Sequence, residues 1–419
     1  MINKFEFLLW FNISIILLIL SLKLTKQSHF VQFRLIKMFK SLLKKNNQKG
    51  ITNFQSLMMT LGGKIGVGSI SGIAIAIYYG GVGTILWMLI ISTIISVFTY
   101  YEVYLGNTYK EIDEDNIYKG GPSYYIKKGL KKNNLSILYT LLVIISYNGC
   151  FLSIQSNTIM KMTKHIFNIN TIIIGISICV ITFIIIYNGI KNIAHISNIL
   201  VPIMLIIYIF LALFILINNT DKLPNIIKLV IYDAFNIKSF IISFIPMIIT
   251  SIKRSIFATE SGIGTTSIAS STTNSDPKTQ GYIQVLGIHI TTFIICLATA
   301  IIILTTNYHS LSLENINGIE LVIYAFNFHF GKFGNTILYI IVLSFCFSTI
   351  ISGYYNGESC LKSLNIKNVF ILKICTVIIL FLGVITSAKV LWNITDLFLG
   401  IMLSINIYAV YKLKNVVKE

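Results

Sequence analysis

Long apolar segments recur along the entire chain, and they limit the possible folds more than any other feature of the sequence. Each one supplies the roughly 20 residues that a helix needs to cross a bilayer. Charged residues make up 11% of the 419 residues, whereas soluble proteins contain about 25%. The sequence therefore predicts an all-α polytopic membrane protein with about eleven transmembrane helices. The predicted spans lie near residues 5–24, 52–79, 82–105, 136–160, 170–188, 194–217, 237–270, 280–305, 335–360, 367–388 and 393–413.

The positive charges predict how these spans are oriented. The formal net charge is +18, and no acidic residue lies between Glu6 and Glu102. Cytoplasmic loops are enriched in Lys and Arg, so the basic segment after the first span is expected inside the cell and the amino terminus outside. On this count the loops at 106–134 and 271–279 and the carboxyl-terminal tail lie inside, and the loops at 306–334 and 389–392 lie outside. The cations that orient the first span are Lys23, Lys26, Arg34, Lys37, Lys40, Lys44, Lys45 and Lys49.

The same basic segment predicts contact with lipid and not with nucleic acid. Its charges lie in a short loop beside a span, where they match the anionic headgroups of the membrane. Phe30, Phe33, Phe39 and Leu43 are spaced so that they can share one face of a helix lying on the membrane surface. The bilayer is therefore an expected partner, and nucleic acid is not.

The sequence shows no pattern that is typical of a catalytic or metal centre. The six cysteines lie in or beside apolar spans without metal-ligand spacing, and the six histidines are scattered. No histidine pairs with a Ser or Cys nucleophile at a recognisable spacing. We therefore expect no enzymatic activity, no bound metal and no organic cofactor.

Two spans contain small polar residues and glycines where a plain helix would be apolar. The sequence is GGKIGVGSISG at 62–72 and FATESGIGTTS at 257–267. Without the first span, the others divide into halves at 52–217 and 237–413, and each motif lies in the first span of its half. Interrupted spans at matching positions indicate an inverted-repeat transporter, in which the ends of half-helices hold substrate and ions. The alternative is a small-residue face for helix packing.

Several motifs in the same order resemble the alanine-or-glycine:cation symporters, the sodium:alanine symporter family of bacteria and archaea. The resemblance covers about residues 50–410. The motifs are GVGSISGIAIAIYYGGVGTILWM at 66–88, YKGGPSYYIKKGL at 118–130, SIQSNTI at 153–159, KRSIFATESGIG at 253–264, QGYIQVLGIHITTFIICLATAIIIL at 280–304, FSTIISGYYNGE at 347–358 and LWNITDLFLGIMLSIN at 391–406.

The resemblance implies a LeuT-like 5+5 inverted repeat with broken first and sixth core helices and one extra amino-terminal helix. It implies Na⁺-coupled symport of a small neutral amino acid, alanine or glycine, across the cell (inner) membrane by a multi-pass monomer. Na⁺ is then a co-transported ion. The corresponding division is 1–49 for the first span and basic cytoplasmic segment, 50–217 for the first repeat, 218–236 for an external linker, and 237–419 for the second repeat and tail.

By position, the resemblance also implies a set of site residues. Those expected to bind substrate are Gly66, Val67, Gly68, Ser69, Gln155, Phe257, Thr259, Thr349 and Gly353. Those expected to bind the cation are Gly66, Ser69, Ser348, Thr349 and Ser352. A pair of opposite charges, Arg254 and Glu260, is a candidate gate or a simple structural ion pair.

Some positions depart from the family pattern and leave alternatives open. Val67, Ser69 and Thr291 replace a threonine, an asparagine and an aspartate, and compositional drift toward Ile, Asn and Lys is one explanation. Gly353 stands where a tryptophan is common, so either the pocket accepts a larger substrate such as glutamine or Tyr354 or Tyr355 fills the space.

Three alternative functions also follow from the sequence. His289 lies within a span and leaves a proton-coupled carrier possible. A degenerate, non-transporting membrane sensor and a channel are further alternatives.

Lys64 directly precedes the first break, where its ammonium group can take the place of a bound cation.

Overall fold

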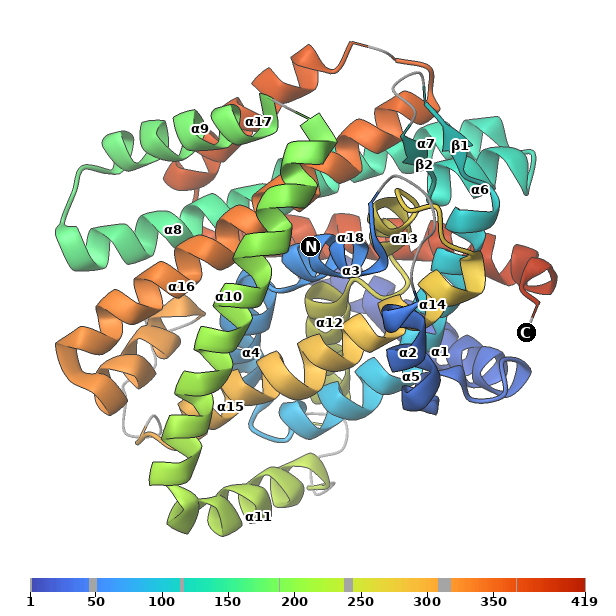
Figure 1. The fold of residues 1–419 in the computed structure, drawn as a ribbon. Helices are drawn as coiled ribbons and strands as arrows, with labels where there is room; N and C mark the ends of the chain where they lie inside the picture. The colour runs from blue at the N-terminus through green and yellow to red at the C-terminus, as the bar shows by residue number, and fades with distance from the viewer. Residues whose placement is uncertain are drawn as a thin grey trace.

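Helices make up nearly all of the computed structural model, which describes residues 2–44, 51–113, 117–187, 189–236, 244–307, 318–366 and 368–418 (Figure 1). The helices up to residue 234 are α1 (Ile2–Gln27), η1 (Val31–Phe33), α2 (Leu35–Leu43), α3 (Asn53–Lys64), α4 (Val67–Gly80), α5 (Thr84–Thr108), α6 (Pro122–Lys128), α7 (Asn133–Val143), η2 (Ile144–Phe151), α8 (Leu152–Phe167), α9 (Thr171–Tyr187), α10 (Gly189–Asn218), η3 (Thr220–Lys222) and α11 (Leu223–Ala234). The later ones are α12 (Ile245–Thr259), α13 (Thr265–Ser270), α14 (Pro277–His289), η6 (Ile290–Cys296), α15 (Leu297–Leu304), α16 (Ile319–Ser363), α17 (Phe370–Ile385), α18 (Ala388–Leu413) and η9 (Lys414–Val416).

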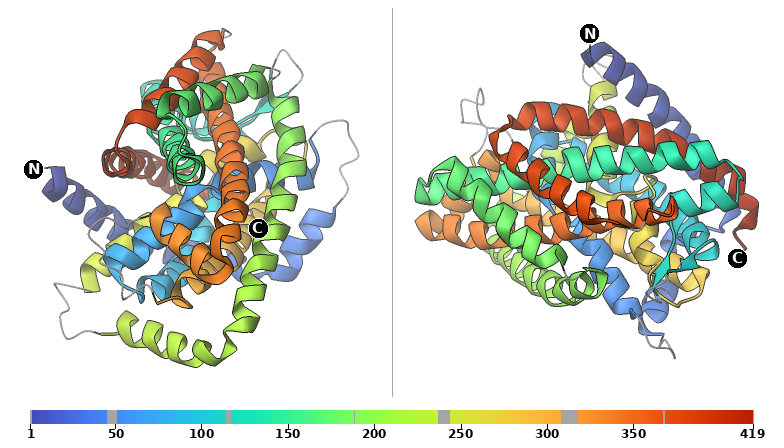
Figure 2. Two further views of the ribbon diagram at one scale, coloured as in Figure 1. Left: turned by 90° about the vertical axis from the view of Figure 1, so that its left-hand side faces the viewer. Right: turned by 90° about the horizontal axis from the view of Figure 1, so that it is seen from above.

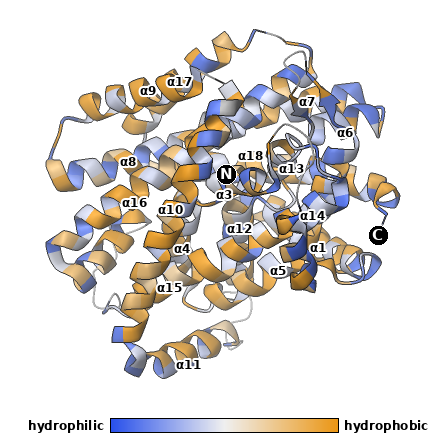
Figure 3. Ribbon diagram, in the orientation of Figure 1, coloured by the Kyte–Doolittle hydropathy of each residue, from blue (hydrophilic) through white to orange (hydrophobic). Residues whose placement is uncertain are grey.

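Eight helical stretches of the described chain are long and apolar enough to cross a membrane, and each coincides with a predicted span. Most of these helices consist largely of apolar residues along their length, which are orange in Figure 3. α9 and α17, at the predicted spans 170–188 and 367–388, are apolar but shorter. The remaining predicted span, 237–270, contains α12, and residues 237–243 lie outside the described residues. The total of eleven spans stays a prediction, as does their orientation.

The two interrupted segments lie in the interior of the helix bundle. α3 and α4 are almost completely buried, and both pack against α16, while α12 packs against α4 and α5. α8 and α16 run side by side, as do α9 and α17 (Figure 1). α1 lies at the edge of the bundle, beside α18 (Figure 2). This arrangement leaves lipid-facing positions to the outer helices and places the breaks at the centre.

The segments between spans carry structure that apolar patterning does not predict. The predicted external linker contains α11, whose Asp233 carboxylate accepts a hydrogen bond from the Gly83 N–H at 2.7 Å. The expected outer loop at 306–334 contains the first part of α16, which bends at Gly331 (φ 59°). The loop at 106–134 holds a short antiparallel hairpin of β1 (Glu111–Ile112) and β2 (Tyr118–Lys119).

The later part of the predicted surface helix is present as α2, whereas Phe30 and Phe33 lie before it, at the short turn η1, and do not share its face. Its Met38 is buried, whereas Phe39 and Leu43 are exposed. α2 packs along α14, so the helix is fixed to the bundle on one side and presents apolar side chains on another. That geometry suits a helix lying at a membrane interface.

Candidate functional site

The first break separates two buried half-helices. α3 ends at Lys64 and α4 begins at Val67, with non-helical backbone at Ile65 (ψ 80°) and Gly66 (ψ −148°). A Cβ on Gly66 would lie 2.2 Å from Thr349 Oγ1, so only glycine lets α16 approach this closely. The break therefore exposes the amino end of α4, where the partial positive charge of the helix favours an anion.

The second break follows α12 and has a different geometry. Glu260 (φ 56°), Gly262 (φ 82°) and Gly264 (φ 101°) all adopt positive φ angles before α13 begins at Thr265. The last hydrogen bond of α12 runs from the Glu260 N–H to the Ile256 carbonyl at 2.8 Å. Because the helix does not continue, no following N–H groups of α12 donate to the carbonyl groups after Ile256. These carbonyl groups give the carboxyl end of α12 a partial negative charge.

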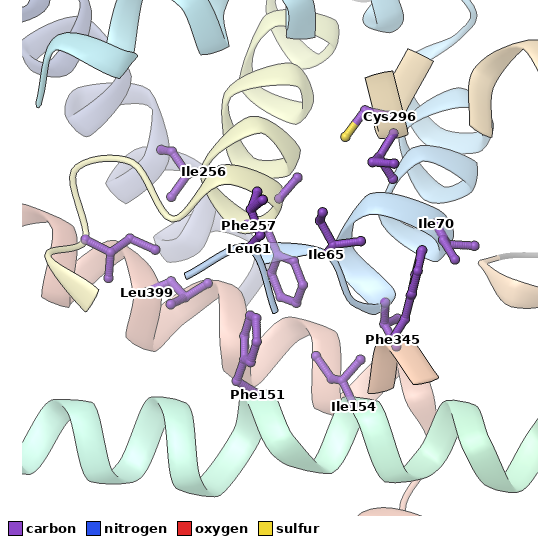
Figure 4. Close-up of a cluster of buried hydrophobic side chains, with 14 of the residues drawn as sticks. Leu61, Ile65, Ile70, Phe151, Ile154, Ile256, Phe257, Cys296, Phe345 and Leu399 are labelled. Carbon is purple, nitrogen blue, oxygen red and sulfur yellow. The ribbon is translucent and has the colours of Figure 1, made fainter. Parts of the chain in front are cut away.

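The two breaks meet at their oppositely charged helix ends. A Cβ on Gly68, in the first turn of α4, would lie 3.3 Å from the Phe257 carbonyl oxygen in the last turn of α12. The close-up of the bundle centre shows Phe257 near the non-helical chain at Ile65 (Figure 4). This arrangement suits a zwitterion, because the amino end of α4 attracts a carboxylate and the carboxyl end of α12 attracts an ammonium group.

Gln155 links the first break to α8. Its side-chain oxygen accepts a hydrogen bond from the Val67 N–H at 3.2 Å. Its Nε2 is buried and has no hydrogen-bond partner among the described residues. The amide therefore fixes the start of α4 and leaves two N–H donors beside it.

Aromatic rings cover the meeting point of the two breaks. The Phe257 ring stacks on Phe151 at 4.7 Å between centroids and lies 4.5 Å from Trp392. The Arg254 guanidinium lies over the Trp392 ring at 4.6 Å. Neither Trp392 nor Phe151 is among the site residues predicted from the sequence, although Trp392 lies in one of the family motifs.

Two of the predicted cation ligands, Ser348 and Thr349, lie beside a different carbonyl group than the expected one of Gly66. The Ser348 and Thr349 hydroxyl oxygens lie 3.1 Å and 3.0 Å from the Gly62 carbonyl oxygen, and each also lies 2.9 Å from the Phe345 carbonyl oxygen in its own helix. Ser352 donates to the Met59 carbonyl at 3.3 Å, while Ser69 donates to the Gly66 carbonyl within its own helix. The three α16 hydroxyls thus meet the last turn of α3, one turn before Gly66. Several hydroxyl and carbonyl oxygens lie together here, which is the ligand type that suits Na⁺.

Two predicted substrate residues lie differently from the others. The Thr259 hydroxyl donates to the Ser255 carbonyl at 2.7 Å within α12. At Gly353 the missing side chain is not replaced by Tyr355, which has no atom among the three nearest to a Cβ at this position. Leu152 lies there instead, with Cδ2 2.6 Å from the position of a Cβ on Gly353.

The expected pairing of Arg254 with Glu260 is wrong. Arg254 Nη2 donates to both carboxylate oxygens of Asp396 in α18, and Glu260 accepts a hydrogen bond from the Thr265 hydroxyl at 2.7 Å. Residues six positions apart point to different faces of a helix, and α12 ends at Thr259, directly before Glu260 with its positive φ of 56°. The Asp396 pair is deeply buried, with side-chain exposures of 4% and 10%.

The histidine and threonine of the eighth predicted span do not face the breaks with their polar atoms. His289 Nε2 lies 2.8 Å from the Gln32 carbonyl oxygen in η1. The Thr291 hydroxyl donates to the Gly287 carbonyl at 3.0 Å in its own helix. The described residues contain no group of three His, Cys, Asp or Glu side chains placed to hold a metal.

A pocket adjoins the aromatic cover at Trp392. It lies between α4, α8 and the first turns of α16 and α18, and Trp392 forms part of its wall. Lys161 and Glu320, which form an ion pair, also line it. The other lining residues are Ser71, Ile75, Ile154, Asn157, Thr158, Gly318, Ile319, Ala388 and Leu391.

Comparisons with known proteins give consistent results along the whole chain. A model of the sodium:alanine symporter family matches residues 1–419. The chain is 32% identical to the probable sodium/glutamine symporter GlnT of Bacillus subtilis, over 98% of this chain and 87% of that protein. It is 28% identical to the sodium/alanine symporter AgcS of Methanococcus maripaludis, over 93% of this chain and 88% of that protein.

The fold is also similar to that of solved structures. One of them is a substrate-bound, outward-open Na⁺-coupled sialic acid symporter, with a TM-score of 0.57 and 12% sequence identity. The match covers 97% of this chain and 86% of that one. At this identity the likeness concerns the fold alone.

Proposed function

The chain belongs to the sodium:alanine symporter family, and from this premise we propose that it carries a small neutral amino acid into the cell together with Na⁺. The meeting of the two helix ends at Gly68 and Phe257 is the observation that supports this proposal most directly. The 5+5 inverted repeat, with α3–α4 and α12–α13 as its two broken helices, is part of the proposal.

Substrate recognition follows from the two helix dipoles. The carboxylate binds at the amino end of α4, where Gln155 Nε2 supplies further donors. The ammonium group binds at the carbonyl groups that end α12. The Phe257 and Trp392 rings close over the amino acid and exclude water. The pocket beside Trp392, with the Lys161–Glu320 pair in its wall, is the route from outside.

Na⁺ binds between α3 and α16. The Ser348, Thr349 and Ser352 hydroxyls and the Gly62 carbonyl are its ligands. Na⁺ at this position holds the inner half of the first broken helix against α16. Because the same helix pair borders Gly66, the cation stabilises the geometry that binds the amino acid.

The space at Gly353 favours a substrate close to alanine in size. Leu152 occupies the volume that a side chain at position 353 would take. The relative named for glutamine makes glutamine the competing candidate. Replacing Leu152 with alanine removes the filling side chain, so the variant is expected to accept larger substrates.

Uptake into proteoliposomes tests the proposal. The purified chain is expected to accumulate labelled alanine when Na⁺ is imposed outside, and glycine and alanine are expected to compete better than glutamine. The L152A variant is expected to shift this competition toward glutamine. Equilibration without accumulation would indicate a channel, binding without uptake a sensor, and accumulation driven by a pH step without Na⁺ a proton-coupled carrier.

A further inference from the structure

A buried group of three charged side chains lies beside the two breaks and is not used by the proposed mechanism. Lys64 is the last residue of α3 and is 1% exposed, Glu102 of α5 is 0% exposed, and Glu260 at the start of the second break is 4% exposed. Burying charged groups is energetically costly unless they are compensated by partners. This group therefore needs an explanation.

The two carboxylates are each only half satisfied. One oxygen of Glu102 accepts a hydrogen bond from Asn406 Nδ2 at 3.0 Å, and one oxygen of Glu260 accepts from Thr265 at 2.7 Å. The second oxygen of each is buried with no hydrogen-bond partner in the described ranges. Asn406 also donates to the Gly262 carbonyl at 2.8 Å, so this polar group is joined directly to the second break.

Lys64 supplies a positive charge to both carboxylates. Its Nζ is buried and makes no hydrogen bond to any residue that the structure describes. The charges that act on it are those of Glu260 and Glu102. A Cβ on Gly287 would lie 3.7 Å from Nζ, so the ammonium group reaches the surface of α14. Lys64 thus connects the first break to α14, α5 and the second break.

The group also adjoins the proposed Na⁺ ligands. A Cβ on Gly63 would lie 2.8 Å from Ser352 Oγ and 3.5 Å from the unpartnered Glu260 Oε1. The carboxylate and the hydroxyl therefore face the same short stretch of α3. With Lys64 present, the three side chains have one formal negative charge, and without it they would have two.

We propose that the Lys64 ammonium group is a tethered cation, which holds the place beside Glu260 and Glu102 that a second Na⁺ would otherwise fill. The inference rests on the proposed Na⁺ coupling and sets its stoichiometry: the carrier binds one Na⁺ per cycle. Lys64 keeps the two breaks together electrostatically without consuming a second ion from the gradient.

The test is the Na⁺ dependence of wild type, K64R and K64M, measured on the purified full chain. Na⁺ binding is followed without amino acid, by the rise in thermal stability with Na⁺ concentration, and uptake is measured separately in proteoliposomes. Wild type and K64R are expected to show a Hill coefficient for Na⁺ of about 1. K64M is expected to show a coefficient approaching about 2 and to need about 10-fold more Na⁺.

A second variant keeps the test informative if K64M folds poorly. K64M/E102Q removes one positive and one negative charge, so it is expected to fold and to return to single-site Na⁺ binding. An unchanged Hill coefficient in folded K64M overturns the proposal. Failure of both variants to fold, with normal K64R, assigns Lys64 a structural role only and also overturns it. Loss of uptake in wild type with intact Na⁺ binding contradicts the proposed function and leaves the role of Lys64 standing.

Discussion

Replacing Gly68 with alanine tests whether the two helix ends are in contact in the working protein. The added Cβ would lie 2.5 Å from Cδ1 and 2.9 Å from Cε1 of Phe257, and 3.3 Å from its carbonyl oxygen. Ordinary contacts begin at 3.4 Å, so the ring must retreat by about 1 Å. Phe257 is stacked on Phe151 and lies tilted against Trp392, and these rings leave it little room to move.

The magnitude follows from overpacking a buried site. Forcing one methyl group into a packed core costs about 1–3 kcal/mol. If the cost falls on the substrate-binding geometry, this corresponds to roughly a 5- to 140-fold rise in KM for alanine. The assay is Na⁺-driven uptake of labelled alanine into proteoliposomes, with thermal unfolding of the purified protein as a measure of stability.

Gly72, one turn further along α4, provides the matched control. A Cβ there would have nothing nearer than 4.0 Å, so G72A is expected to resemble wild type. The double variant G68A/F257L exchanges the rigid ring for a smaller side chain and is expected to recover part of the loss. If G68A and G72A transport alanine equally well, the contact between the first turn of α4 and Phe257 does not form in the transporting protein, and the zwitterion argument fails.

Two further predictions concern groups away from the substrate. R254M or D396N alone leaves one buried charge without its partner and is expected to destabilise the protein by about 3–5 kcal/mol in detergent unfolding. The double variant R254M/D396L should recover most of the lost stability. The control is K44Q, because the Lys44–Asp276 ion pair is exposed (62% and 45% of the two side chains), and its stability should stay within about 1 kcal/mol of wild type. Equal losses of stability in R254M and K44Q would contradict the prediction that burial makes the Arg254–Asp396 pair important. Burial, opposed by the charge of Asp276, lowers the pKa of Lys110 from 10.5 to about 8. Between about pH 8 and 10.5 the unfolded chain therefore binds more protons than the folded one, so the stability of the folded protein rises with pH in this window. The Tm of wild type should increase relative to that of K110M over the same range. A Tm difference that does not change with pH would contradict the lowered pKa of Lys110.

The Lys110 ammonium group is partly buried because it joins two segments at the same end of the bundle. Its Nζ donates to the Thr273 carbonyl at 2.7 Å and to the Ser275 carbonyl at 3.2 Å. Both carbonyl groups belong to the connection between α13 and α14. The hydrogen bonds hold the ammonium group in a partly buried position, where losing water disfavours its charge.

The sequence by itself determined where the long apolar helices lie and where two of the predicted spans break. Apolar length is a local property, so each of the eight long apolar stretches could be located without any knowledge of its neighbours. The breaks are also encoded locally. The 257–267 motif places Gly262 and Gly264 where φ is positive, a conformation that most other residues avoid. At Gly66 the need for glycine comes from the close approach of α16, but the motif still identified the position.

Only the tertiary structure decided which side chains meet. Arg254 pairs with Asp396, 142 residues away, and not with Glu260, six residues away. Leu152 fills the space at Gly353, although adjacent tyrosines were the candidates. The surroundings of Lys64 come from α5, α14 and the second break. Such contacts depend on the register and facing of helices that are distant in sequence, and hydrophobic periodicity does not specify that relationship, because many packings bury the same apolar faces equally well.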